Sequence, residues 1–164
     1  MGTAERVCVD FDVLKRLIAA LEARGVDYAI FGAVAMTLHG LARTTDDIDI
    51  FIAPDAVNID RLRAALRDVF DDPQIEEITA ADLLGDFPSV RYAPPDGTFY
   101  MDILTRLGDA FTFADLETER VPFDDLTATV VTPQTLYRMK KDTVRLKDRA
   151  DAELLRRRFR LEAD

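Results

Sequence analysis

The sequence contains one cysteine, Cys8, and one histidine, His39. A single cysteine cannot form a disulfide within the chain, which agrees with a reducing compartment such as the cytosol. His39 has no second histidine or cysteine nearby, so the ligands of a transition-metal site are missing. Its position before Gly40 instead predicts a role at the C-terminal end of a helix.

Long hydrophobic runs are also missing. The longest apolar stretch, 28–38, is too short to span a bilayer and contains Gly32 and Thr37. The N-terminus has no basic segment followed by an apolar one, as a secretion signal would have. We therefore expect a soluble, cytoplasmic protein with no membrane partner.

Acidic residues dominate the 164-residue chain, which has a net charge of −10. Residues 1–137 carry 11 Lys and Arg against 25 Asp and Glu, whereas residues 138–160 carry 10 against 4. The acidic part would repel a nucleic-acid backbone, which favours a small molecule or a nucleotide as substrate. The run from Arg156 to Arg158 fits either a solvated last helical turn or a contact with a polyanion.

Hydrophobic periodicity predicts an α/β (α+β) fold with a small mixed sheet flanked by helices. We expect one domain, 1–164, with a sheet-containing core at 1–131 and a basic helical arm at 132–164. The expected strands are 27–31, 47–52, 75–78, 98–104, 120–123 and 127–131, with hairpin turns near 94–97 and 124–125. The expected helices are 11–24, 33–39, 59–70, one that begins at 133 and one near 147–160, with a helical turn near 80–84. The last two would form a hairpin that packs through Leu136, Met139, Thr143 and Leu146 on one side and Ala150, Leu154, Leu155 and Phe159 on the other.

Two carboxylates, Asp47 and Asp49, lie two positions apart in the strand 47–52. Because side chains alternate along a strand, both point to one face, with their Cα atoms roughly 6–7 Å apart. Ile48, Ile50 and their neighbour Ile52 point to the opposite face and into a core. Asp102 is a lone acid in the strand 98–104.

Three strand carboxylates would form a site of hard oxygen ligands, suited to Mg²⁺ or Mn²⁺ with substrate phosphates completing the shell. Such a site supports phosphoryl or nucleotidyl transfer. Gly32, at a strand-to-helix turn, would let phosphate approach the backbone closely. The alternative is that Asp47 and Asp49 face solvent on an edge strand while Asp102 caps a turn.

The set of Gly32-Ala33, Asp47-Ile48-Asp49 and Asp102 resembles the active-site pattern of the polymerase-beta-type nucleotidyltransferase superfamily. Two further motifs resemble those of AbiEii-like nucleotidyltransferases, which are toxins of type IV toxin–antitoxin systems, or of small stand-alone relatives. One is Arg43-x-Thr45-x-Asp47-x-Asp49. The other comprises Lys140, Arg145, Lys147, Asp148 and Asp151.

The resemblance implies an enzyme that moves an NMP from an NTP, such as ATP, to an acceptor hydroxyl with two Mg²⁺ ions. Asp47 and Asp49 would bind metal, and Asp102 would complete the site and help to activate the acceptor. Nucleotide contacts would come from Gly32, the Ala33 amide, Arg43, Thr45 and the third motif, in which Lys140 would neutralise phosphate.

Several alternatives stay open. Arg145, Lys147, Asp148 and Asp151 fit either the nucleotide site or an ion-paired helical hairpin. The acceptor is unknown and could be tRNA, a small molecule such as an antibiotic, or a protein; the toxin reading adds an antitoxin protein as partner. Ala33 in place of the usual Ser or Gly, together with the short segment after the third motif, also fits a catalytically degenerate module that binds a nucleotide or a partner.

Overall fold

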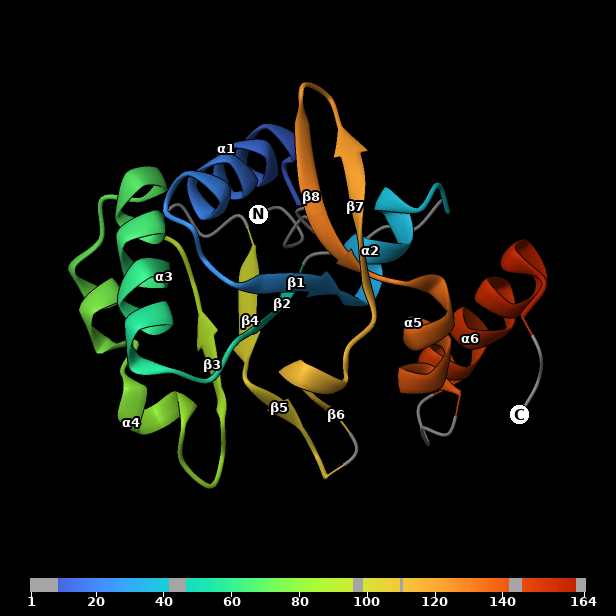
Figure 1. Ribbon diagram of the computed structural model, residues 1–164. Coiled ribbons are helices and arrows are strands. Elements are labelled where there is room, and N and C mark those ends of the chain that lie inside the picture. The colour runs from blue at the N-terminus through green and yellow to red at the C-terminus, as the bar shows by residue number, and fades with distance from the viewer. Residues whose placement is uncertain (1–8, 42–46, 96–98, 110, 142–145, 162–164) are drawn as a thin grey trace, which may run out of the picture.

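The structure, a computed structural model, describes residues 9–41, 47–95, 99–109, 111–141 and 146–161. A six-stranded mixed sheet in the order β3-β4-β2-β1-β8-β7 forms its centre (Figure 1). β1 runs parallel to β8, and β2 runs parallel to β4, whereas the other neighbours are antiparallel. The strands are β1 (Tyr28–Phe31), β2 (Asp47–Ile52), β3 (Ser89–Tyr92), β4 (Tyr100–Leu104), β7 (Thr118–Phe123) and β8 (Leu126–Val131). The expected mixed sheet flanked by helices is confirmed.

Helices lie on two sides of the molecule. Helices α1 and α3 pack side by side on one side, and α5 and α6 form a contacting pair on the other (Figure 1). The helices are α1 (Phe11–Ala23), α2 (Gly32–Leu38), α3 (Ala56–Val69), α4 (Ala80–Leu83), α5 (Pro133–Lys140) and α6 (Leu146–Phe159). The C-terminal helical hairpin is therefore confirmed.

Local sequence signals explain where these helices begin. The Asp10 side chain accepts a hydrogen bond from the Asp12 amide at the start of α1, and Thr132 caps α5 ahead of Pro133. Both arrangements satisfy backbone N–H groups that have no partner within the helix. Gly25 follows the end of α1 with a φ of 65°, a conformation that glycine adopts without steric cost.

The two faces of β2 have opposite characters. Ile48, Ile50 and Ile52 are fully buried in the hydrophobic core. Each buried isoleucine stabilises the fold by about 1.5–3 kcal/mol. The other face carries Asp47 and Asp49. The alternation inferred from the sequence is thus present, and it aims the carboxylates away from the core.

The expected strand at 75–78 is wrong. Pro73–Glu77 forms a 3₁₀ helix, η1, whose start is capped by the side chain of Asp72. Only Ile75 and Ile78 are apolar in the expected strand, and their spacing of three fits a helical turn. The structure also contains a small hairpin of β5 (Arg106–Leu107) and β6 (Phe111–Thr112), which was not expected from the sequence. A second 3₁₀ helix, η2 (Phe113–Asp115), follows it.

The buried face of α6 differs from the expected one. Ala150 is exposed and Leu154 is 48% exposed, whereas Ala152 and Leu155 are buried, as is Asp151. Asp151 pairs with Lys140 of α5, so this ion pair helps to set which face of α6 turns inward. Thr143 and the side chain of Leu146 lie outside the described residues.

His39 caps the C-terminus of α2, as expected. Its side chain does more than the sequence indicated, because the ring is buried. Nε2 lies 2.8 Å from the carbonyl oxygen of Val131, and Nδ1 lies 3.3 Å from a Glu119 oxygen. His39 therefore connects α2 to β7 and β8 and has a structural position.

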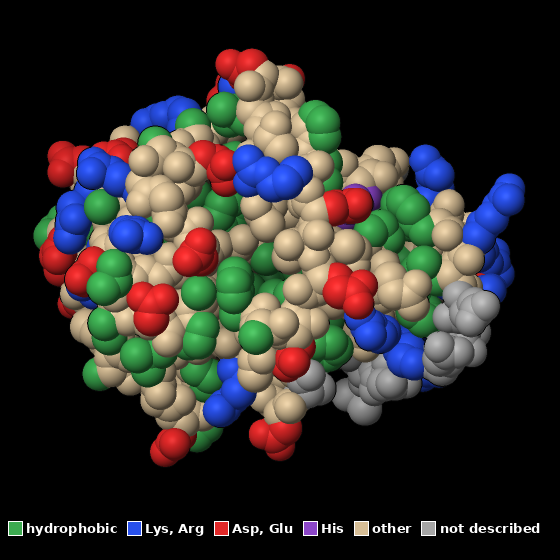
Figure 2. Space-filling model, in the orientation of Figure 1, with side chains coloured by type: hydrophobic (Ala, Val, Ile, Leu, Met, Phe, Trp, Pro, Cys, Tyr) green, Lys and Arg blue, Asp and Glu red, His purple; other side chains and the backbone are tan. Residues whose placement is uncertain are grey.

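Basic side chains gather at the end of the molecule formed by α6 (Figure 2). Glu153 pairs with both Arg156 and Arg157, and these two arginines lower the pKa of Glu153 to about 2. Arg158 lies over the ring of Phe159, with 5.5 Å between its guanidinium carbon and the ring centroid. Within the described ranges, no helix has both the length and the apolar composition that crossing a bilayer requires.

Candidate active site

A row of four side chains crosses the sheet on one face. Strand register places Arg91 of β3 opposite Asp102 of β4, Asp102 beside Asp49 of β2, and Asp49 opposite Phe31 of β1. Asp47 lies one pleat away from Asp49 on the same face. The parallel pairing of β2 with β4 brings together carboxylates that are 53 positions apart in the sequence.

Gly32 directly follows β1 and lies against the carboxylate of Asp49. It has a φ of 71°, and a Cβ atom at this position would collide with a carboxylate oxygen of Asp49 and lie 3.0 Å from its Cγ. Both the backbone conformation and the available space therefore require glycine. Gly32 is the first residue of α2, so β1, α2 and β2 meet at this carboxylate.

Asp49 is the electrostatic centre of the site. Burial, together with the nearby charges of Asp102 and Asp47, raises its pKa to about 7, and a hydrogen bond with Asp102 acts in the same direction. The positive charge of Lys140 opposes these effects. The local potential is strongly negative, and it would be relieved by a bound cation or a proton.

Arg91 holds Asp102 in a bidentate pair. Its Nε lies 2.9 Å from one carboxylate oxygen and its Nη2 lies 3.2 Å from the other. Arg91 was not expected as a site residue, although the sequence contains a signal for it. The observed pairs of β3 and β4, such as Ser89 with Leu104, are centred between positions 96 and 97. A two-residue turn at the Asp-Gly step there would have placed Arg91 opposite Asp102.

Lys140 links the two C-terminal helices. Its Nζ lies 3.2 Å from a carboxylate oxygen of Asp148 and 3.1 Å from one of Asp151, and all three side chains are largely buried. For Asp148 and Asp151 the structure therefore contains the ion-paired hairpin that the sequence left as an alternative. Lys140 also faces the site, because it lines the same pocket as Asp49 and Gly32.

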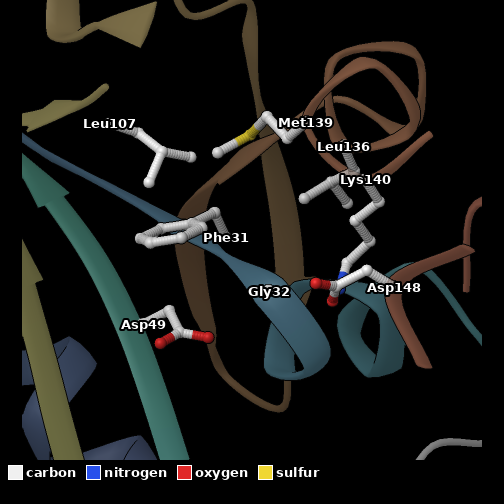
Figure 3. A pocket seen from close by; sticks show the side chains of 8 residues that line it. All are labelled: Phe31, Gly32, Asp49, Leu107, Leu136, Met139, Lys140 and Asp148. Atoms are coloured by element: carbon white, nitrogen blue, oxygen red, sulfur yellow. The ribbon is translucent and has the colours of Figure 1, made fainter. Parts of the chain in front are cut away.

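A cavity of about 250 Å³ lies between the sheet and the helical pair (Figure 3). Its polar wall is formed by Gly32, Asp49, Lys140 and Asp148, and its apolar wall by Phe31, Leu107, Leu136 and Met139. In Figure 3 the Asp49 carboxylate and the Lys140 ammonium group lie on either side of Gly32. The apolar residues were not expected as site residues, because their contact depends on the packing of α5 over the sheet.

The remaining expected site residues lie farther out or cannot be placed. Ala33 is half-buried in the first turn of α2, and its carbonyl oxygen accepts a hydrogen bond from the Thr37 side-chain hydroxyl at 3.2 Å. Lys147 is exposed at the start of α6 and does not line the cavity. Arg43, Thr45 and Arg145 lie outside the described residues.

The carboxylates suit a hard divalent cation chemically, because they offer only oxygen ligands. Within the part of the chain that the structure describes, no group of three or more His, Cys, Asp and Glu side chains is arranged to hold a metal ion. Both oxygens of Asp102 contact Arg91. A cation at Asp49 would therefore take part of its shell from substrate oxygens, as Mg²⁺ commonly does.

No protein-family model matches the sequence, and the search against curated proteins gives no match. Solved structures do match. The lincosamide antibiotic adenylyltransferase LnuA, solved with lincomycin bound, aligns with a TM-score of 0.59 at 16% identity, over 91% of this chain and 98% of that chain.

Two further structures give similar alignments. TM1012 of Thermotoga maritima, a protein assigned to the nucleotidyltransferases, has a TM-score of 0.56 at 16% identity and covers 92% of both chains. ANT(2")-Ia in complex with adenylyl-2"-tobramycin has a TM-score of 0.55 at 13% identity, over 92% of this chain and 90% of that chain. The chain therefore has the fold of the nucleotidyltransferases.

Proposed function

We propose that this protein is a nucleotidyltransferase that moves a nucleoside monophosphate from an NTP to an acceptor hydroxyl. The observation that carries the proposal is the register that sets Asp49 beside Asp102, with Gly32 pressed against Asp49. A cavity with a cationic side and an apolar side adjoins these groups. The fold shared with LnuA and ANT(2")-Ia supports the same class of reaction.

The position of each residue in the site suggests its role in the reaction. Gly32 and the Ala33 amide would contact the triphosphate, and Lys140 would neutralise part of its charge. The attacking hydroxyl forms a bond to the α-phosphorus while the bond to the pyrophosphate breaks, and Asp102 would accept the hydroxyl proton. Phe31, Leu107 and their apolar neighbours in the cavity would cover the base or the sugar.

Asp47, Asp49 and Asp102 are the residues that would hold divalent cations. When bound there, Mg²⁺ would favour ionisation of the attacking hydroxyl and stabilise the charge that develops on the leaving pyrophosphate. The carboxylates themselves position the two reacting groups. Asp49 is the residue on which the site depends most, because it is buried between the other two acids and Gly32.

The acceptor is the second substrate of the proposed reaction. The structures of LnuA with lincomycin and ANT(2")-Ia with adenylyl-2"-tobramycin favour an antibiotic-type small molecule by fold analogy, whereas tRNA and protein acceptors remain alternatives. The toxin assignment, with its antitoxin partner, depends on the third sequence motif. In that motif Lys140, Asp148 and Asp151 pair with one another.

Isothermal titration with non-hydrolysable NTP analogues, with and without Mg²⁺, tests the proposal. Asp49→Asn should lose the Mg²⁺-dependent binding, and Asp71→Asn serves as a control because it removes the same charge from an exposed position. Transfer from an α-labelled NTP to a panel of acceptors completes the test. If Asp49→Asn transferred the label as fast as the wild type, the mechanism would be wrong.

A binding module without turnover is the second candidate. It is favoured by Ala33, which lacks the hydroxyl of a serine, and by the engagement of both Asp102 oxygens by Arg91. In that case the NTP analogue binds, but no acceptor becomes labelled. Binding and labelling measured on the same preparation separate the two candidates.

A further inference from the structure

Arg91 and Tyr100 form an exposed pair beside the carboxylates, which we call the acceptor platform. The guanidinium carbon of Arg91 lies 5.0 Å from the centroid of the Tyr100 ring. The Arg91 side chain is 58% exposed, and Tyr100 is 47% exposed. Register places Arg91 opposite Asp102 and Tyr100 beside Asp47, so the platform borders two of the three acids.

The platform and the cavity lie on opposite sides of Asp49. Along the sheet, Arg91 on β3 is followed by Asp102 on β4, Asp49 on β2 and Phe31 on β1. Gly32 and Lys140 lie beyond Asp49, where they line the cavity. This order gives the row two different ends, one at the cavity and one at the edge strand β3.

In nucleotidyl transfer the attacking and leaving oxygens lie roughly in line on opposite sides of phosphorus. If the triphosphate lies toward Gly32 and Lys140, the acceptor hydroxyl must approach from the side of Asp102. Arg91 and Tyr100 are the side chains of β3 and β4 that border this approach. The acceptor platform therefore faces the acceptor and not the NTP.

The chemistry of the platform restricts the acceptor. A guanidinium group binds phosphate oxygens in pairs and remains charged at any physiological pH. An exposed aromatic ring next to it offers a surface on which a sugar or a base can stack.

We propose that Arg91 and Tyr100 bind the acceptor and that this acceptor carries a phosphate group near the hydroxyl that is modified. The inference rests on the proposed function. The phosphate group could belong to the end of a nucleic-acid chain or to a small phosphorylated sugar. The shared chemistry is an anionic group next to a ribose-like hydroxyl.

Direct binding measurements test this proposal without requiring catalytic turnover. Ribose 5-phosphate, a short oligoadenylate and tobramycin are titrated separately into the wild type, Arg91→Gln and Arg91→Lys. Arg106→Gln is the matched control, because Arg106 is an exposed arginine on β5 whose Nη2 lies 3.4 Å from a backbone oxygen of Asp86. Urea unfolding of each variant confirms that it is folded, and Arg91→Lys keeps the charge at the same place.

We expect at least one phosphate probe to bind the wild type, and Arg91→Gln to weaken that binding about tenfold or more. Arg91→Lys should recover part of the affinity, and Arg106→Gln should leave it unchanged. If Arg91→Gln weakens the binding of oligoadenylate more, the acceptor is the end of a nucleic-acid chain. If it weakens the binding of ribose 5-phosphate more, the acceptor is a small phosphorylated sugar.

Two results would overturn the inference: neither phosphate probe binds, or Arg91→Gln binds them as tightly as the wild type. Tighter binding of tobramycin than of both phosphate probes would also contradict it. Failure of the NTP analogue to bind is a separate result from a separate titration, and it would refute the proposed function instead.

Discussion

Replacing Gly32 by alanine tests the contact on which the candidate site is built. Two costs add at this position. A residue with a Cβ atom at a φ of 71° is strained by about 1–2 kcal/mol. The new methyl group must also displace the Asp49 carboxylate, and such overpacking costs about 1–3 kcal/mol. The free energy of unfolding should therefore fall by about 2–5 kcal/mol, which a domain of ordinary stability tolerates.

Gly25→Ala is the matched control. Gly25 has a similar φ of 65°, but no atom lies within 4 Å of the position that a Cβ would take. Only the backbone cost of about 1–2 kcal/mol should appear there. The difference between the two variants thus isolates the collision with Asp49.

Urea denaturation and titration with an NTP analogue and Mg²⁺ measure the two consequences. Gly32→Ala should lose affinity for the nucleotide, because displacement of a functional group by about 1 Å can cost on the order of a hundredfold. Gly25→Ala should bind like the wild type. Equal unfolding energies for the two variants, with unchanged nucleotide binding in Gly32→Ala, would refute the reasoning.

Three further predictions concern stability. Lys140→Met should lower the free energy of unfolding by about 3 kcal/mol in urea denaturation, because it removes a buried ammonium group that pairs with the buried Asp151. Glu22→Gln should make the melting temperature fall less steeply in acid. Arg120 lowers the pKa of Glu22, so the ion pair stabilises the fold above the unfolded pKa, and this stabilisation is lost as the pH falls through the folded pKa. Melting temperatures between about pH 3 and 7 check this. Asn58→Ala should cost about 2–3 kcal/mol in urea, because the buried amide of Asn58 bonds to three backbone groups.

Sequence patterns predict elements well where one physical signal dominates. The helix at 11–24 is confirmed as Phe11–Ala23, because a cap, a regular apolar face and a terminal glycine agree. The strand at 47–52 is confirmed with the same bounds, because only alternation can bury three isoleucines and place two acids on the opposite face. The segment 75–78 failed because two isoleucines were interpreted as a strand while Asp72 and Pro73 favoured a helical start.

The candidate site also combines features that local sequence predicts with features that depend on tertiary packing. The spacing of Asp47 and Asp49 predicts their shared face, but their pairing with Asp102 depends on strand order, which local sequence does not encode. The ion pairs of Lys140 depend on how α6 turns against α5, and that orientation results from packing. Arg91 could have been found from its distance to the hairpin centre, since antiparallel register follows from turn length.

The fold tolerates the repulsion among Asp47, Asp49 and Asp102 because β2 carries its acids on one face and three buried isoleucines on the other. Raising the pKa of Asp49 from 3.8 to about 7 corresponds to roughly 4 kcal/mol in favour of its protonated form. Because the pKa of Asp49 is higher in the folded state than in the unfolded chain, the folded state loses stability as the pH rises from the unfolded pKa through the folded one. Burial of the three isoleucines on the opposite face contributes about 1.5–3 kcal/mol each and offsets this cost. The strand that stabilises the core thus also carries the charges that a nucleotide site requires, and the opposition of its two faces is why both can be encoded in six residues.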